Sequence, residues 1–124
     1  MSSALERTIA QLTKTLVENL QDEIESIILY GSVARGEANE NSDIDILIIT
    51  RRGNRELYNK ISKIRTKIDL ENNTLTTLIQ MSKNEIEKYM RFNSPFIENI
   101  LKEGVTLYDR GLLNKLRKSI TLEG

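Results

Sequence analysis

Four residues of types that can bind phosphate and metal stand at the facing ends of two apolar runs. Gly31 and Ser32 close the first run, and Asp43 and Asp45 open the second after ten intervening residues. Side chains alternate between the faces of a strand, so the two aspartates project to the same side. Their Cα atoms would lie about 6.5 to 7 Å apart, where two unit charges repel by roughly 2 to 3 kcal/mol at an effective dielectric constant of 20. A divalent cation between them would turn this repulsion into attraction, so the spacing predicts a metal site.

The composition of the chain narrows the choice of metal. There is no Cys and no His in the sequence, so the candidate ligands are carboxylate oxygens, which suit Mg²⁺ or Mn²⁺ better than zinc. Gly31 would let backbone N–H groups approach a phosphate, the Ser32 hydroxyl could donate to it, and the start of a helix adds favourable partial charge. Arg35 supplies a permanent positive charge nearby. These residues together predict the binding of a nucleoside triphosphate whose oxygens also contact the metal.

A structural interpretation of the same residues stays open. Gly31 and Ser32 could form an ordinary turn, and the two acids could be solvated charges that protect an edge strand. The order of the two groups at the ends of apolar runs favours the functional interpretation. Tyr30, directly before the glycine, could stack on a nucleotide base or belong to the core, and the sequence does not decide between them.

Residues 31–36 (Gly-Ser-Val-Ala-Arg-Gly) and 42–47 (Ser-Asp-Ile-Asp-Ile-Leu) resemble the signature of the minimal nucleotidyltransferases of the DNA polymerase β superfamily. This resemblance implies an α/β (α+β) fold, with a small mixed sheet flanked by helices. It implies that Asp43 and Asp45 are catalytic metal ligands and that the Gly-Ser turn contacts the nucleotide phosphates. The expected reaction moves a nucleoside monophosphate, such as AMP from ATP, to an acceptor hydroxyl.

The sequence departs from that family at one position. The family usually carries a third acidic residue on a later strand, but the candidate strand here, residues 75–81, contains no carboxylate. Strand alternation aligns Thr77 with the third acid, and a neutral hydroxyl is a poorer metal ligand and a weaker base. Asp69 and Glu71, just upstream, could reach the site from a loop. We therefore expect slow turnover compared with a complete triad.

The resemblance also implies a partner. Proteins of this size in the family often act beside a helical protein of the HEPN (frequently ribonuclease-toxin) type, and some transfer AMP to a tyrosine of that partner and silence it. Two alternatives stay open: a catalytically weak nucleotide-binding subunit that neutralises its partner by contact, and a transferase acting on a small molecule such as an aminoglycoside. The sequence leaves the oligomeric state open.

Composition limits the other classes of function. The 124 residues predict a single domain spanning 1–124, and 18 basic residues balance 18 acidic ones, which argues against strong nucleic-acid binding. No stretch approaches the roughly 20 apolar residues of a membrane-spanning helix, and the N-terminus lacks a signal-peptide pattern. With no cysteine in the chain, these features favour a cytoplasmic protein without membrane contact.

Hydrophobic periodicity predicts the elements that position the motif. Ser82 with Glu85 reads as a capping box before one helix, and Ser94 with Pro95 marks the start of the next. In chain order, we expect a helix over 3–20, a strand over 24–30, a strand over 43–50, a helix over 54–70, a strand over 74–81, a short helix after Ser82, a helix from Ser94 to Gly104, an edge strand over 105–108 and a final amphipathic segment after Gly111.

Overall fold

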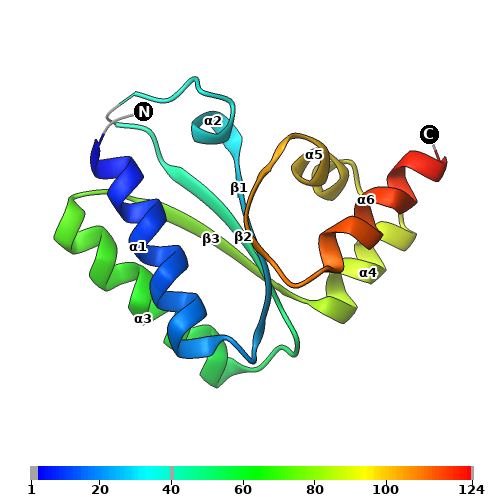
Figure 1. The fold of residues 1–124 in the computed structure, drawn as a ribbon, viewed down its shortest axis with the longest axis horizontal. Helices are drawn as coiled ribbons and strands as arrows, with labels where there is room; N and C mark the ends of the chain where they lie inside the picture. The colour runs from blue at the N-terminus through cyan, green and yellow to red at the C-terminus, as the bar shows by residue number, and fades with distance from the viewer. Residues whose placement is uncertain (1–2, 40, 124) are drawn as a thin grey trace.

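A four-stranded mixed sheet, ordered β3-β2-β1-β4, carries helices on both faces in the computed structural model, which describes residues 3–39 and 41–123 (Figure 1). β1 pairs antiparallel with both β2 and β4, whereas β2 and β3 are parallel and joined by the crossover helix α3. The elements are α1 (Ser3–Leu20), β1 (Ile24–Tyr30), α2 (Gly31–Ala34), β2 (Ile44–Thr50), α3 (Arg55–Asn72), β3 (Thr76–Ser82), α4 (Lys83–Arg91), α5 (Pro95–Glu103), β4 (Val105–Asp109) and α6 (Leu112–Glu123).

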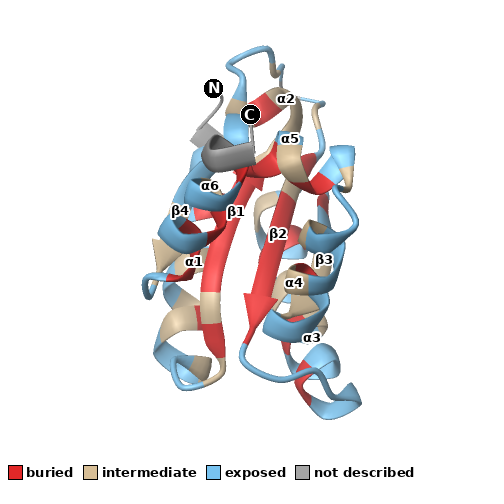
Figure 2. Cartoon of the chain, turned by 90° about the vertical axis from the view of Figure 1, so that its right-hand side faces the viewer, coloured by how far each residue is buried: buried red, intermediate tan, exposed pale blue. Residues whose placement is uncertain are grey.

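The central strands β1 and β2 are buried on both faces, which explains why their apolar runs are continuous rather than alternating (Figure 2). On one face, Ile44, Ile46 and Ile48 pack against the apolar stripes of α1 and α3. On the other face, Leu47 and Ile49 pack against α4, α5 and α6. Asp45 belongs by alternation to this second face, and it lies at the start of β2, where the core gives way to solvent.

Local capping signals set the helix boundaries as expected. The Ser82 side chain accepts from the Glu85 N–H, and the Glu85 carboxylate accepts from the Ser82 N–H, which confirms the capping box at the start of α4. Ser94 caps α5 with Pro95 in its first turn, and α5 ends at Gly104. The edge strand and the final helix are also where the sequence predicts them.

The prediction that Asp69 and Glu71 could reach the site from a loop is wrong. Helix α3 continues to Asn72 and ends where Asn73 adopts a left-handed conformation with φ of 54°. The boundaries of β2 and β3 also shift inward at their starts, to Ile44 and Thr76. Both acids are therefore held on α3, which packs on the face of the sheet away from Asp45.

Asp69 has a structural role. Its buried carboxylate accepts hydrogen bonds from the Thr74 hydroxyl at 2.8 Å, the Thr76 hydroxyl at 2.8 Å and the Thr76 backbone N–H at 2.9 Å. These bonds tie the end of α3 to the start of β3. The carboxylate is therefore engaged in fixing the chain and is not available to a metal beside Asp45.

Replacing Asp69 with Ala is expected to lower the free energy of unfolding by about 3 kcal/mol, because three bonds are lost and a buried N–H is left without a partner. Urea unfolding followed by circular dichroism measures this loss. An Asp69→Ala variant as stable as the parent would contradict the structural role.

The helices of the described residues include none with the length and apolar character needed to cross a membrane.

Candidate active site

Gly31 lies directly against the carboxylate of Asp45. Its φ is +77°, and a Cβ at this position would overlap Oδ2 of Asp45 and approach Cγ at 3.2 Å. The antiparallel register explains this proximity, because Tyr30, the last residue of β1, pairs with Asp45 on β2. Only glycine combines this backbone conformation with so close an approach. The fold thus brings the two halves of the sequence motif into contact.

The turn after Gly31 leaves its donors available. Residues Gly31–Ala34 form a single helical turn whose first N–H groups have no helical acceptors, and the preceding Tyr30 makes no side-chain cap. Ser32 is half-buried, and its hydroxyl has no hydrogen-bond partner among the described residues. These groups have the chemistry needed to bind phosphate oxygens next to Asp45.

The two aspartates interact electrostatically, as their spacing predicts. Burial raises the pKa of the Asp45 carboxyl above its usual value, and the negative charge of Asp43 raises it further, while the Arg35 guanidinium lowers it. The folded chain therefore holds the ionised Asp45 at a cost in free energy. Asp43 is exposed and Asp45 is half-buried at the end of the core. Two adjacent carboxylates that repel each other and offer only oxygen donors fit a hard divalent cation such as Mg²⁺ or Mn²⁺.

Arg35 lies at the end of the same helical turn. Its Nε is 3.2 Å from the Glu37 carboxylate, and both side chains are about half exposed or more. An exposed pair of this kind is weak, so the guanidinium can exchange Glu37 for a stronger anion. Its effect on the Asp45 pKa shows that it is also close enough to act on the site.

Tyr30 packs against the core, which is one of the two roles that the sequence left open, and its stacking on a nucleotide base stays a prediction. Its ring packs with the core cluster of α4 to α6 and meets the ring of Phe96, the two centroids being 6.0 Å apart and the planes nearly perpendicular. Burial, and then the charge of Asp45, raise the pKa of Tyr30 to about 12, so its hydroxyl stays protonated as a possible donor. Phe96 was missed by sequence reasoning, because an exposed aromatic at a helix start carries no signal of its neighbours.

Thr77 occupies the position expected for a third acid. It pairs in parallel register with Asp45, so the two side chains project to the same face of adjacent strands. Thr77 is exposed and brings no carboxylate. Across residues 3–39 and 41–123 there is no cluster of three or more Asp, Glu, His or Cys residues suited to a metal. The carboxylate pair therefore stands without a third acidic neighbour in the described part of the chain.

Replacing Thr77 with Asp is expected to raise the transfer rate by about tenfold or more, because an added carboxylate could bind the metal and accept the acceptor's proton. Steady-state transfer of labelled nucleotide measures the change. Thr77→Asn is the matched control, with nearly the same shape but no charge, and should leave the rate unchanged. Equal rates for the Asp and Asn variants would contradict the assignment of this position.

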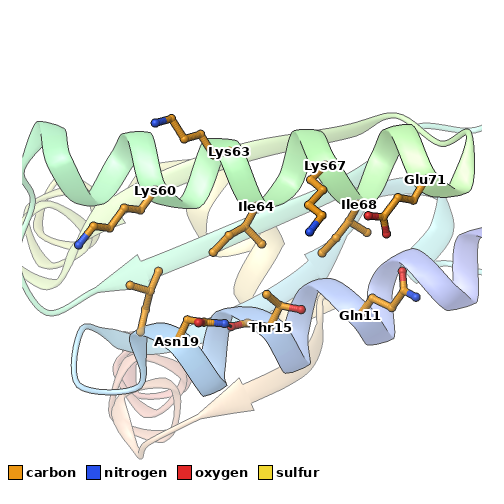
Figure 3. A pocket seen from close by; sticks show the side chains of 10 residues that line it. Gln11, Thr15, Asn19, Lys60, Lys63, Ile64, Lys67, Ile68 and Glu71 are labelled. Carbon is orange, nitrogen blue, oxygen red and sulfur yellow. Dashed lines mark hydrogen bonds between the residues drawn. The ribbon is translucent and has the colours of Figure 1, made fainter.

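A groove of about 640 Å³ lies between α1 and α3, away from the candidate metal site (Figure 3). Its lining includes Lys60, Lys67 and Glu71, and the lysine chains extend from α3. This groove is on the face of the sheet opposite Asp45. Glu71 therefore lies on a different surface from the candidate metal site. The residues that line this groove are separated from Asp43 and Asp45 by the sheet.

Residues 10–111 match the family described as "Polymerase beta, Nucleotidyltransferase". One relative, named "Putative protein adenylyltransferase MJ0604", from Methanocaldococcus jannaschii, is 34% identical over 103 residues, which cover 83% of this chain and 97% of the relative. The chain therefore belongs to the polymerase β nucleotidyltransferase family and is a nucleotidyltransferase.

Solved structures share the fold at lower identity. Spectinomycin adenyltransferase AAD(9) from Enterococcus faecialis, solved with ATP and spectinomycin, matches with a TM-score of 0.70 at 15% identity over 90% of this chain and 58% of the other. A complex of the tri-AMPylated Shewanella oneidensis HEPN toxin with an MNT antitoxin matches with a TM-score of 0.53 at 16% identity, over 93% of this chain and 86% of the other. These likenesses establish the mixed sheet flanked by helices as a nucleotidyltransferase fold.

Proposed function

We propose that this nucleotidyltransferase is a Mg²⁺-dependent adenylyltransferase that moves AMP from ATP to a hydroxyl of a protein partner. The observation that carries the proposal is the contact of Gly31 with Asp45, because it sets phosphate-binding backbone beside a pair of repelling carboxylates. A polyphosphate with a divalent cation satisfies both groups at once. In this assignment Asp43 and Asp45 hold the metal, and Gly31, Ser32 and Arg35 hold the nucleotide.

The reaction needs little covalent work from the protein. The acceptor oxygen attacks the α-phosphorus of ATP, the bond from that phosphorus to the pyrophosphate oxygen breaks, and pyrophosphate leaves with its electron pair. Backbone N–H groups of the turn and the Ser32 hydroxyl orient the phosphates, while Arg35 offsets negative charge. A bound Mg²⁺ would supply further neutralisation of phosphate charge from its place on Asp43 and Asp45. The acceptor proton goes to solvent or to a phosphate oxygen, because Thr77 is a poor base.

A protein acceptor of the HEPN type is supported by two of the likenesses. The relative from Methanocaldococcus jannaschii is named as a protein adenylyltransferase, and one of the solved complexes pairs an MNT antitoxin with an AMPylated HEPN toxin. A tyrosine hydroxyl is the acceptor we expect. In this role the chain would be the antitoxin of a two-protein system.

A second candidate function is favoured by one observation. Thr77 replaces the third acid, so the chain could bind nucleotide and neutralise its partner by contact with little transfer. The third candidate function is transfer to a small hydroxyl compound. It is supported by the likeness of the fold to that of a spectinomycin adenyltransferase.

One experiment separates the three. The protein is incubated with Mg²⁺, ATP labelled at the α-phosphorus, and in turn the product of a neighbouring gene or an aminoglycoside. Label on the neighbouring protein supports the proposed function. A stable complex without label supports neutralisation by contact, and label on the small molecule alone supports the third role.

A further inference from the structure

The outer edge of β3 carries backbone groups that no other strand uses. β3 is at the end of the sheet, and among the described residues β2 is its only strand neighbour. The Ile44 N–H donates to the Leu75 carbonyl at 2.9 Å, so the peptide group of Leu75 faces β2. Because successive residues alternate, the N–H and C=O groups of Leu78 and Gln80 face outward, away from β2.

Both ends of this edge are closed by side chains, but its middle is open. At one end the Thr76 N–H is bound by Asp69, and the Thr76 carbonyl accepts from Arg65 at 3.3 Å. At the other end the Ser82 N–H is bound by the Glu85 carboxylate. Proteins normally protect exposed edges along their length. The open stretch between these two closures leaves room for a short extended peptide.

A groove runs beside the open stretch. Its volume is about 270 Å³, and it lies between β3 and α3, with residues of both elements in its lining. Two buried polar atoms in this lining, Nε of Arg65 and Oε1 of Gln80, have no hydrogen-bond partner within residues 3–39 and 41–123. One is a donor and the other an acceptor, which are the two groups that a peptide unit can complement. Tyr58 and Leu75, both more than half exposed, add apolar surface to the same groove.

The register connects this edge to the candidate active site. Thr77 is the neighbour of Asp45 on the adjacent strand, and strands in a sheet are about 4.8 Å apart. A strand added outside β3 would therefore set the residue opposite Thr77 about 9.6 Å from Asp45, on the same face. A tyrosine there would extend over Thr77 toward the nucleotide, and the alternate residues would point to the groove beside α3.

We propose that the acceptor polypeptide binds as an added strand on the outer edge of β3, paired through Leu78 and Gln80, with its hydroxyl-bearing residue opposite Thr77. This inference rests on the proposed transfer function and specifies its acceptor site. Main-chain pairing holds the acceptor in register, and the alternation of its side chains selects which residue receives the nucleotide.

The test compares an extended acceptor with a minimal one. The probes are a library of eight-residue peptides, each with one tyrosine between randomised residues, and N-acetyltyrosine amide, with ATP labelled at the α-phosphorus. We expect kcat/KM for the best peptides to exceed that for the amide by roughly tenfold, the value of one or two backbone hydrogen bonds. Leu78→Pro removes an outward N–H and should return this ratio to about one, without changing transfer to the amide. Leu78→Ala is the matched control, because it loses the same side chain but keeps the N–H, and it should retain the ratio.

Hydrogen exchange gives a second measurement that needs no variant and decides the question if Leu78→Pro does not fold. The best labelled peptide should slow the exchange of the Leu78 and Gln80 amides in the parent protein. Equal kcat/KM for peptides and amide, an unchanged ratio in Leu78→Pro, or unprotected amides would each overturn the inference and leave the transferase function intact. Concentration-dependent protection without peptide would overturn it in favour of a second copy of the chain. Absence of label on every acceptor, the neighbouring gene product included, would overturn the proposed function and this inference together.

Discussion

Replacing Asp43 and Asp45 together with Asn is expected to lower nucleotide transfer by at least about 10³-fold, because the metal contributes several kcal/mol of transition-state stabilisation. The double variant should fold, since burial and Asp43 already raise the pKa of Asp45 and the ionised pair is held at a cost. Without metal, its melting temperature should equal or exceed that of the parent. Added Mg²⁺ should raise the melting temperature of the nucleotide-bound parent and leave that of the variant unchanged.

Asp22→Asn is the matched control for this experiment. Asp22 is an exposed acid in the turn before β1, so its substitution changes the net charge without touching the motif. It should leave both transfer and the Mg²⁺ effect unchanged. Unfolding of the double Asn variant would show that the two acids are structural, which is the interpretation that the sequence left open.

The substitution Gly31→Ala is expected to abolish nucleotide binding and to lower the free energy of unfolding by about 2 to 4 kcal/mol. The added methyl group overlaps the Asp45 carboxylate, and φ of +77° is unfavourable for any residue with a Cβ. To relieve the overlap, either the turn or the carboxylate must move, and each movement separates phosphate donors from metal ligands. Titration with a fluorescent ATP analogue and urea unfolding measure the two effects.

The chain offers a matched control in Gly36→Ala. Gly36 has nearly the same φ, +73°, but a Cβ there meets no atom of the described residues within 4 Å. This variant should lose only the conformational term, about 1 kcal/mol, and should bind nucleotide normally. Equal losses of affinity in the two variants would mean that backbone strain, and not contact with Asp45, explains the glycine at position 31.

The sequence predicts the features that depend on the alternation of side chains along a strand and on helix capping. Side chains alternate along a strand, so the sequence aligns Thr77 with the family's third acid, and in the folded chain Thr77 pairs with Asp45. The capping residues Ser82 and Ser94 act on N–H groups three residues away, and their pattern is visible in a short stretch of sequence.

The parts that could not be predicted depend on contacts between distant segments. Helix α3 extends past its expected end because Asp69 binds backbone and side chains of the next strand, a gain that helical periodicity does not express. The overlap between Gly31 and Asp45 and the packing of Phe96 on Tyr30 depend on the exact separation of elements. Hydrophobic patterns predict which face of a helix or strand is buried, but they do not predict the distances between elements.

The burial of β1 and β2 on both faces has a consequence for how the catalytic groups are held. Gly31 directly follows one of these strands and Asp45 is the second residue of the other, so both are anchored to the most deeply buried backbone of the molecule. Fluctuations that loosen surface helices need not alter the separation of these two residues, since opening the central pair would require dismantling both cores. The distance between the phosphate-binding turn and the carboxylate pair is thus fixed by the cooperative folding of the whole chain. The motions needed for catalysis are then those of the acceptor as it binds and leaves.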